Sequence, residues 1–235
     1  MTGKTMDFTL NEQQESIRDA IGKLCVRFDD AYWLKKDETG EFPEELYQAI
    51  ARDGWLGIFI PEAYGGSGLG ITEAAVMMQA IAESGAGMSG ASAVHMNIFG
   101  LNPVVVFGNE EQRERMLPPL VRGKEKACFA VTEPNTGLNT TQLKTRAVRK
   151  GNHYVVNGAK VWISTAQVAN KMLLLARTHA IGRGQEEHAR PVPFLHGPRP
   201  QDCRREAHPQ DGPRRSGLQR ALHRRIEDPR RGSHR

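Results

Sequence analysis

The hydrophobic period of this chain changes once, near Ala127, and that change constrains the fold more than any other feature. Before it, apolar residues recur at the spacing of one helix face. After it, they alternate with polar residues or gather in short runs bounded by turn residues, as strands do. We therefore expect an α+β chain in which an all-α part precedes a β-rich part.

The all-α part carries clear start signals. Thr9 followed by Glu12 has the pattern of a capping box, so a helix is predicted to begin there. A second helix is predicted to begin within residues 41–45, with Pro43 near its first turn, and to end before Gly54. The apolar stripe of the first helix comprises Ile17, Ile21, Leu24 and Phe28. Further helices are predicted over residues 72–83, 89–107 and 109–121, with a cap pair at Asn109 and Gln112, an irregular turn at residues 85–87 and a kink or break at Pro103.

Residues 65–70 form a glycine-rich run after a short apolar segment. Such a run can cradle a phosphate through its backbone N–H groups. The dinucleotide-binding pattern, however, needs a glycine three positions after Gly68, and Ile71 stands there. A tight loop before the next helix is favoured over a phosphate site.

The β-rich part is predicted to be an antiparallel meander that begins a small β-barrel or sandwich. Asn157 followed by Gly158 is a strong hairpin signal, and residues 150–152 indicate another turn. The strand signal ends at about Arg177, so we expect the barrel to be incomplete. Strands are predicted at residues 128–132, 143–148, 154–156, 161–164 and 172–176.

Residues 178–235 differ from the rest in composition. Their net charge is +6, against −1 for the first 177 residues, so the basic pI of 9.2 belongs to this segment. Only seven of these 58 residues are Leu, Ile, Val or Phe, which is too few to bury a core. Two hypotheses explain the segment: a tail translated out of frame, or a basic disordered arm that binds nucleic acid or acidic partners. The loss of lysine and of interleaved aromatic residues favours the first.

Signals for export, membranes and metals are weak. The three cysteines, Cys25, Cys128 and Cys203, match no disulfide or metal spacing, so we expect buried or free thiols in a reducing compartment. The N-terminus lacks the apolar core of a secretory signal, and no apolar run approaches a membrane-spanning length. A cytoplasmic protein without membrane association or a metal site is expected.

Two separated motifs suggest a family. Ile-Pro-Glu-Ala-Tyr-Gly-Gly-Ser-Gly occupies residues 60–68, and Cys-Phe-Ala-Val-Thr-Glu-Pro-Asn-Thr-Gly at residues 128–137 precedes Lys-Val-Trp-Ile-Ser-Thr at residues 160–165. With the helical front before the meander, residues 6–177 resemble the acyl-CoA dehydrogenases. The resemblance implies an N-terminal helical domain over residues 1–122, the start of the flavin-binding β-domain over residues 123–177, and a tail over residues 178–235. The family's C-terminal helical bundle is expected to be absent.

The resemblance also implies where FAD and substrate would bind. Thr132 would hydrogen-bond the polar edge of the isoalloxazine, together with the backbone of its strand. Trp162 would pack on a ring face, and Ser164 would offer a hydroxyl toward flavin N5. At Leu138 the family usually has a serine near the CoA or flavin phosphates, so this position departs from the pattern. The expected cofactor contacts are Phe129, Val131, Thr132, Gly137, Leu138, Trp162, Ile163 and Ser164, and the expected substrate contacts are Leu138 and Asn139.

The implied activity is FAD-dependent α,β-dehydrogenation of an acyl-CoA thioester in fatty acid metabolism, with electrons passed to an electron-transfer flavoprotein. The family's catalytic glutamate and its tetramer contacts lie in the C-terminal bundle. No catalytic residue is therefore assigned here, and this fragment is expected to be inactive and not to form the tetramer. Glu133 is interpreted as a loop carboxylate, and His95 and His153 as structural or surface residues. The alternatives are a related oxidase or nitroalkane-type enzyme, a non-catalytic remnant, or a basic-tailed protein that binds nucleic acid.

Overall fold

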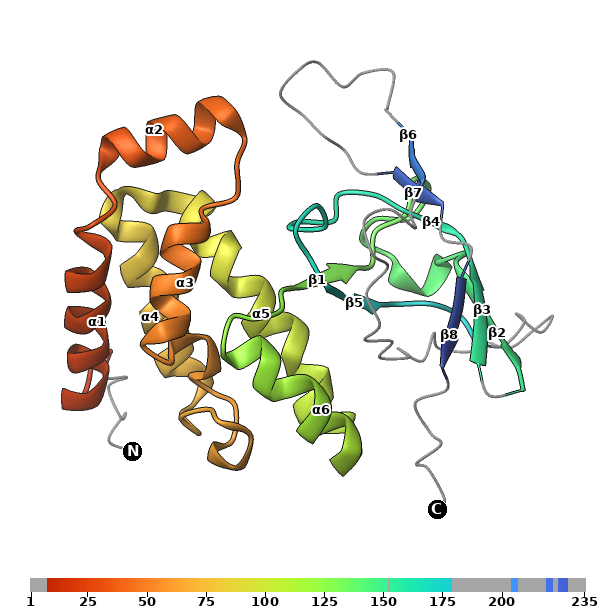
Figure 1. The fold of residues 1–235 in the computed structure, drawn as a ribbon, viewed down its shortest axis with the longest axis horizontal. Helices are drawn as coiled ribbons and strands as arrows, with labels where there is room; N and C mark the ends of the chain where they lie inside the picture. The colour runs from red at the N-terminus through yellow and green to blue at the C-terminus, as the bar shows by residue number, and fades with distance from the viewer. Residues whose placement is uncertain (1–7, 152, 179–203, 207–218, 222–223, 228–235) are drawn as a thin grey trace, which may run out of the picture.

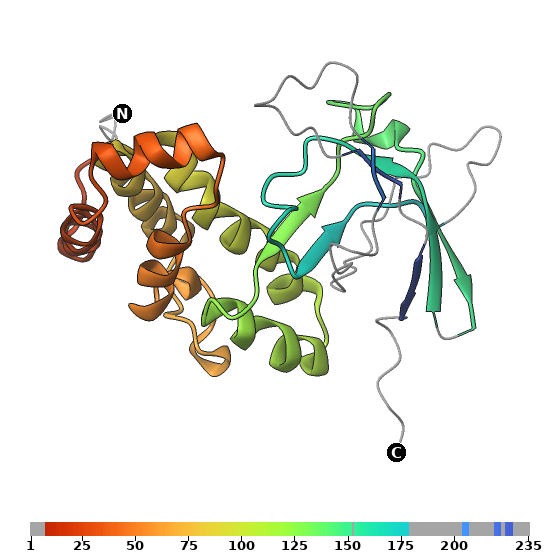
Figure 2. The same ribbon diagram turned by 45° about the horizontal axis from the view of Figure 1, so that its top comes forward.

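The computed structural model describes residues 8–151, 153–178, 204–206, 219–221 and 224–227. The helices gather in one lobe and the strands in another (Figure 1). Strands β1 (Ala127–Ala130) and β5 (Lys171–Leu174) lie between them, which Figure 2 shows from a second direction. The order of helices before strands confirms the predicted helical front and β-rich second part.

The helical lobe is built from elements that pack pairwise around one apolar core. Helix α1 contacts α3 and α4, and α5 contacts α4, α6 and β1. Short 3-10 turns, η1 (Trp55–Gly57) and η2 (Glu62–Tyr64), connect the helices. The α-helices of this lobe are α1 (Glu12–Cys25), α2 (Asp30–Thr39), α3 (Glu44–Arg52), α4 (Ile71–Ile81), α5 (Gly87–Phe107) and α6 (Glu110–Val121).

Of the two predicted helix caps, one is confirmed and one is wrong. Asn109 and Gln112 form a capping box at the start of α6, as expected. The predicted pair at Thr9 and Glu12 is wrong, because α1 is capped by Asn11, whose side chain accepts the Gln14 N–H at 2.9 Å. The Gln14 side chain in turn accepts the Asn11 N–H at 3.1 Å. Both pairs have the same spacing, but asparagine caps more strongly than threonine.

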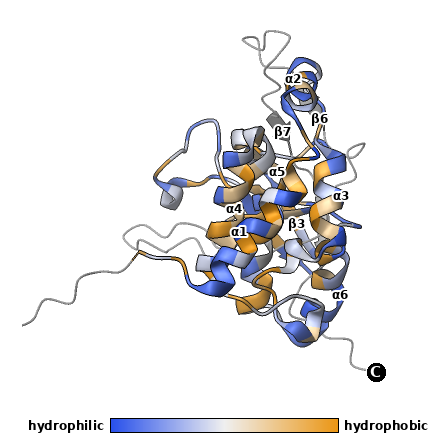
Figure 3. Cartoon of the chain, turned by 90° about the vertical axis from the view of Figure 1, so that its left-hand side faces the viewer, coloured by the Kyte–Doolittle hydropathy of each residue, from blue (hydrophilic) through white to orange (hydrophobic). Residues whose placement is uncertain are grey.

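Helix α2 was not predicted, and its burial explains why. Asp29 caps its start, and Gly40 ends it in the left-handed conformation with φ of 68°. None of its side chains is fully buried, so no apolar stripe marks it in the sequence. Figure 3 shows α2 standing apart from the orange, apolar segments of α1, α4 and α5.

The α4–α5 pair confirms one prediction and corrects two. The irregular turn is present: Gly85 and Gly87 have positive φ of 93° and 52° within and after η3 (Ala82–Ala86). Helix α5 continues through Pro103, so of the predicted kink or break at this residue the break is wrong. The segment Ile71–Phe107 is also long and apolar enough to cross a membrane by composition, contrary to expectation. Since 56% of its most apolar window is buried inside the protein, it is accounted for as the central helical pair of the core.

The glycine-rich run folds as the predicted tight loop. The Ser67 N–H donates to Gly57 O, the Gly68 N–H to Ile60 O, and the Leu69 N–H to Ile58 O, each at 2.9 Å. A Cβ on Gly66 would lie 2.0 Å from Ile60 O, so only glycine fits there. The amides that a phosphate would need are already bonded within the protein.

The strands form three small sheets among the described residues. Strand β1 pairs with β5 in parallel; β2, β3 and β8 form an antiparallel sheet; and β4, β7 and β6 form another. The bounds are β2 (Arg146–Lys150), β3 (His153–Asn157), β4 (Ala159–Lys160), β6 (Arg204–Glu206), β7 (Gln219–Ala221) and β8 (Arg224–Glu227).

The predicted antiparallel meander is correct for one hairpin and wrong elsewhere. The β2–β3 hairpin turns at Gly151, whose φ is +63°. Asn157 and Gly158 do not form a hairpin, because β3 and β4 belong to different sheets. Glycine is needed there for another reason: its Cβ would lie 2.3 Å from Thr145 Oγ1. The strand predicted at residues 161–164 is also wrong, since β4 ends at Lys160 and irregular backbone follows.

Three segments of the predicted tail form strands β6, β7 and β8, so the expectation of a wholly unstructured tail is not met there. The remainder of residues 178–235, including Cys203, lies outside the described residues apart from Thr178. Cys25 and Cys128 are buried free thiols, as predicted. The β-rich lobe has its own core, and a smaller cluster joins α5, α6 and β1.

Candidate functional site

The end of β1 is bonded to the segment that precedes Trp162. Val131 O accepts a hydrogen bond from Lys160 Nζ at 2.7 Å, and Thr132 O accepts the Val161 N–H at 3.0 Å. These bonds place the Thr132 and Trp162 positions on two neighbouring backbone segments. The two residues on which the flavin interpretation depends most are thus brought together by the fold.

Glu133 and Lys160 form a buried ion pair beneath this junction. Lys160 is 0% exposed and Glu133 6% exposed, and Lys160 Nζ lies 3.0 Å from Glu133 Oε1. The Glu133 carboxylate also accepts the Lys144 N–H at 2.6 Å and the Thr145 N–H at 2.9 Å. Glu133, interpreted from the sequence as a loop carboxylate, is buried and accepts hydrogen bonds from three donors.

The surroundings shift the pKa values of both groups. Burial alone would raise the pKa of Glu133, but hydrogen bonds from Thr145, Lys144 and Lys160 lower it below its ordinary value. Burial lowers the pKa of Lys160, and Glu133 opposes that shift. A carboxylate that is held ionised and saturated with donors is a poor proton acceptor. Glu133 is thus suited to hold the backbone in place and not to act as a base.

Trp162 combines an exposed side chain with an unfavourable backbone conformation. It is 69% exposed, and its backbone lies in the left-handed region with φ of 59°. That conformation is unfavourable for a bulky residue and is held here by bonds on both sides. Thr165, three residues later, has φ of 60°, and its hydroxyl lies within donating distance of Ser164 O at 2.6 Å and of Ala127 O, in β1, at 3.3 Å. The strained segment is therefore fastened to β1 at its far end as well.

The remaining expected flavin contacts are distributed unevenly. Phe129 and Val131 are half-buried at and just after β1, and Thr132 is half-buried beyond it. Ser164 is exposed, next to Trp162. Ile163 is 6% exposed and packs in the core of the β-rich lobe, with its side chain away from solvent.

The positions expected to meet substrate lie in an open loop after Pro134. Leu138 is fully exposed, and a Cβ on Gly137 would meet no atom within 4 Å. The Asn139 side chain accepts the Thr141 N–H at 3.2 Å and so caps the short turn η4 (Thr140–Gln142). This loop has room for a ligand, whereas Asn139 is already engaged within the protein.

Lys160 was missed as a site residue although the sequence held a signal for it. Tyr154 and Val156 point into the core, and Lys160 has the same parity along the chain. A lysine at an inward position requires a buried carboxylate partner. That requirement points to an acidic residue elsewhere in the sequence, and the structure identifies it as Glu133.

The start of β1 is held by a second buried polar cluster. Asn97, which is 1% exposed, donates to the Tyr47 hydroxyl and to Leu120 O, and its Oδ1 accepts the Ala127 N–H at 3.1 Å. The Tyr47 hydroxyl donates to Glu125 O at 3.2 Å. These bonds join α3, α5 and the end of α6 to β1, so the helical lobe sets where the strand begins.

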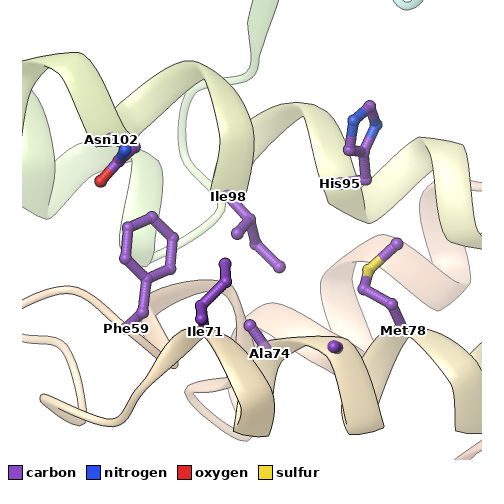
Figure 4. A pocket seen from close by; sticks show the side chains of 8 residues that line it. Phe59, Ile71, Ala74, Met78, His95, Ile98 and Asn102 are labelled. Atoms are coloured by element: carbon purple, nitrogen blue, oxygen red, sulfur yellow. The ribbon is translucent and has the colours of Figure 1, made fainter.

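An apolar cavity of about 370 Å³ lies between α4 and α5. Figure 4 shows Ile71, Ala74 and Ile98 facing one another across it, with the His95 ring directed away from α4. The cavity borders the face of α5 opposite Gly100, where an added Cβ would lie 3.5 Å from the Ala127 Cβ of β1. It is therefore separate from the junction at the other end of β1. Its lining is Phe59, Ile71, Ala74, Ala75, Met78, His95, Ile98 and Asn102.

The residues at the junction fit a flavin ring. Trp162 is a large exposed aromatic residue, Thr132 lies on the backbone segment bonded to its own, and Ser164 is two residues further along the chain. An apolar wall with nearby polar donors is the usual lining of a cofactor site. Within the described part of the chain, no group of three or more His, Cys, Asp or Glu residues gathers to hold a metal.

Comparison with known proteins agrees with this arrangement. The sequence profile of the acyl-CoA dehydrogenase N-terminal domain matches residues 11–124, and that of the acyl-CoA dehydrogenase middle domain matches residues 128–198. The second match runs past Arg177, where the resemblance seemed to end from sequence alone. Residues 179–198 lie outside the described residues.

Two curated relatives and one solved structure illustrate the similarity. The chain is 33% identical over 175 residues to the probable acyl-CoA dehydrogenase YngJ of Bacillus subtilis, which covers 74% of this chain and 45% of that protein. It is 34% identical over 171 residues to mitochondrial isovaleryl-CoA dehydrogenase of Bos taurus, covering 72% of this chain and 40% of that protein. A glutaryl-CoA dehydrogenase from Mycobacterium smegmatis in complex with FADH2 superposes with a TM-score of 0.72 at 22% identity, covering 93% of this chain and 54% of that one.

The chain spans less than half the length of these two curated relatives. The two domain matches adjoin each other in the order of the helical and β-rich lobes. By these matches, and by the fold that carries them, the chain belongs to the acyl-CoA dehydrogenase family.

Proposed function

We propose that this chain takes part in FAD-dependent α,β-dehydrogenation of an acyl-CoA thioester. The observation that carries the proposal is the junction at the end of β1, where Thr132 and Trp162 lie on hydrogen-bonded backbone segments. FAD, when bound, supplies the acceptor for the hydride that leaves the acyl β-carbon. Electrons are then expected to pass to an electron-transfer flavoprotein.

The chain's own residues would orient and enclose the ring. The Thr132 hydroxyl and neighbouring backbone groups would bind its polar edge, where negative charge grows as the flavin is reduced. Trp162 would cover one face and exclude water from it. Ser164 would offer a second hydroxyl from the adjoining turn.

The base that removes the acyl α-proton is not assigned to Glu133, because that carboxylate accepts three hydrogen bonds. We propose that this base lies outside the described residues. The 235-residue chain alone is then expected to bind FAD weakly and to show no turnover. Steady oxidation of an acyl-CoA by the purified chain would contradict this part of the proposal.

Flavin titration tests the proposal directly. The purified chain is titrated with FAD while flavin fluorescence is followed, with circular dichroism as the check that it is folded. Trp162→Ala is expected to weaken binding by up to about tenfold, the size of a lost aromatic contact. Trp33→Phe is the matched control, because Trp33 packs against the helical core away from β1. A folded chain without measurable FAD binding would refute a flavin site at this junction.

A further inference from the structure

Lys160 connects more of the candidate site than a single ion pair requires. Its ammonium donates to Val131 O at 2.7 Å and to Glu133 Oε1 at 3.0 Å, so it holds the residues on both sides of Thr132. Lys160 is also two residues before Trp162. One buried cation thus bridges the two segments that would enclose the flavin.

Glu133 extends this connection to a third segment. Its carboxylate accepts the N–H groups of Lys144 and Thr145, which lead into β2. Gly158 lies against Thr145, since a Cβ there would come within 2.3 Å of the Thr145 hydroxyl oxygen. The backbone at residues 131–133, 144–145 and 158–161 therefore meets around one charge pair.

A buried pair is an expensive way to hold a fold together. Replacing such a pair with apolar residues of similar size is often neutral or stabilising, whereas removing one partner leaves an unpaired buried charge. If the pair served only stability, two apolar residues could replace it. They could not orient the backbone in the same way, because only the ammonium reaches both Val131 O and Glu133.

We propose that Lys160 is a positioning residue that sets Thr132 and Trp162 relative to each other, with Glu133 as its counter-ion. The flavin part of this inference rests on the proposed function. The backbone part does not, because it concerns bonds that exist without a ligand.

The first test uses no flavin. Amide hydrogen exchange, followed by mass spectrometry, compares wild type with Lys160→Met and the double variant E133Q/K160M. The amides of Lys144, Thr145 and Val161 are expected to exchange at least about tenfold faster in the variants. The reason is that the charge pair that holds these backbone segments together is lost. Peptides from the helical lobe should keep their protection.

The matched control is the ion pair between Lys171 and Glu125, which spans 3.0 Å near the opposite end of β1 and is partly exposed. Lys171→Met should leave exchange at residues 131–133 and 158–161 unchanged. Lys160→Arg, which keeps the charge, should retain most of the protection. Unchanged protection at the three amides in a folded Lys160→Met or double variant would overturn the proposal.

The second test separates positioning from stability. The double variant should regain thermal stability relative to Lys160→Met, because it carries no unpaired buried charge. Its FAD affinity should nonetheless stay about tenfold or more below that of wild type. Recovery of FAD affinity together with stability would show that the pair is only structural and would overturn the inference.

The two hypotheses fail in different ways. If wild type binds no FAD, the proposed function fails, while the exchange experiment still decides the positioning role. If both Lys160→Met and the double variant lose protection across the whole protein, Lys160 is required for folding in general and the positioning claim is refuted.

Discussion

Both ends of β1 are held by buried polar groups, but the groups are of opposite kinds. At its start, Asn97 and Tyr47 form a neutral cluster that joins the strand to the helical lobe. At its end, Glu133 and Lys160 form a charged cluster that joins it to the segment before Trp162. Neutral groups hold the lobes together, and charged groups lie where the cofactor contacts are expected.

This difference has a physical basis. Amide and hydroxyl groups lose little on burial when each finds a partner, and burial raises the pKa of Tyr47, so it stays uncharged. An ion pair must overcome a large desolvation penalty. The fully buried pair lies at the end of β1, whereas the Lys171–Glu125 pair near its start is partly exposed, which fits a requirement for orientation at the site.

The largest effect is expected from Lys160→Met. Removing the ammonium leaves the Glu133 charge buried without its cation, which should lower the free energy of unfolding by about 3–5 kcal/mol. Urea denaturation at pH 7 measures this. Lys171→Met, from a partly exposed pair, should lower it by less than about 1 kcal/mol. Similar losses for both variants would remove the contrast between the buried pair and an ordinary one.

Asn97→Leu should come second. It leaves the buried Ala127 N–H without its partner, at about 1–3 kcal/mol for the unsatisfied group, whereas Leu120 O keeps the Gly123 N–H at 3.0 Å. Asn135→Leu, at an exposed loop position, should change stability by no more than about 0.5 kcal/mol. The same urea series decides, and FAD affinity should be less affected by Asn97→Leu than by Lys160→Met. The reverse order would place the orienting role in the neutral cluster.

Two glycines near the charged cluster offer a smaller and sharper test. Gly158→Ala puts a methyl group 2.3 Å from Thr145 Oγ1 and should cost about 1–2 kcal/mol as backbone shifts. Gly137→Ala meets nothing within 4 Å and should be neutral to about 0.5 kcal/mol. Thermal unfolding compares them. If Gly158→Ala left thermal stability unchanged, the close packing of residue 158 against Thr145 would not be needed to hold the charged cluster.

The smallest expected effect is on the pH dependence of stability. The pKa of Glu133 is lowered on folding, so its contribution is present above the ordinary carboxyl pKa of about 4.3 and is lost as pH falls through the lowered folded value. Glu133→Gln removes this contribution. The gap in unfolding free energy between wild type and Glu133→Gln should therefore narrow as pH falls from 7 toward 3. A gap that stays constant would mean that Glu133 titrates alike in both states.

The elements with strong local signals could be predicted from sequence. The α6 cap at Asn109, the turn at Gly151 and the inward alternation of Leu143, Thr145 and Ala147 all depend on neighbours close in the chain. Helix α2 could not, because none of its side chains is fully buried and no apolar stripe marks it. The parallel pairing of β1 with β5 was not part of the predicted meander, because strand partners and direction depend on the path between strands and not on either strand's pattern.

The candidate site was predictable in its residue types but not in its support. Thr132 and Trp162 stand in motifs, whereas the positive φ of Trp162 has no sequence signal in a non-glycine residue. The bridge from Lys160 to Glu133 joins positions far apart in the chain, so the inward parity of Lys160 indicates a buried acidic partner but not which one.

The parallel pairing of β1 with β5 bears on the order in which the molecule can fold. Ala127 is matched with Lys171, so β1 has no partner until the chain has passed through the whole Thr132–Trp162 region and reached β5. Bringing together residues so distant along the chain is slow, since the entropy of closing the loop is lost before the contacts are gained. We therefore expect the junction that would receive the flavin to form only after β5 has paired with β1, and later than the β2–β3 hairpin, whose strands are neighbours in the chain.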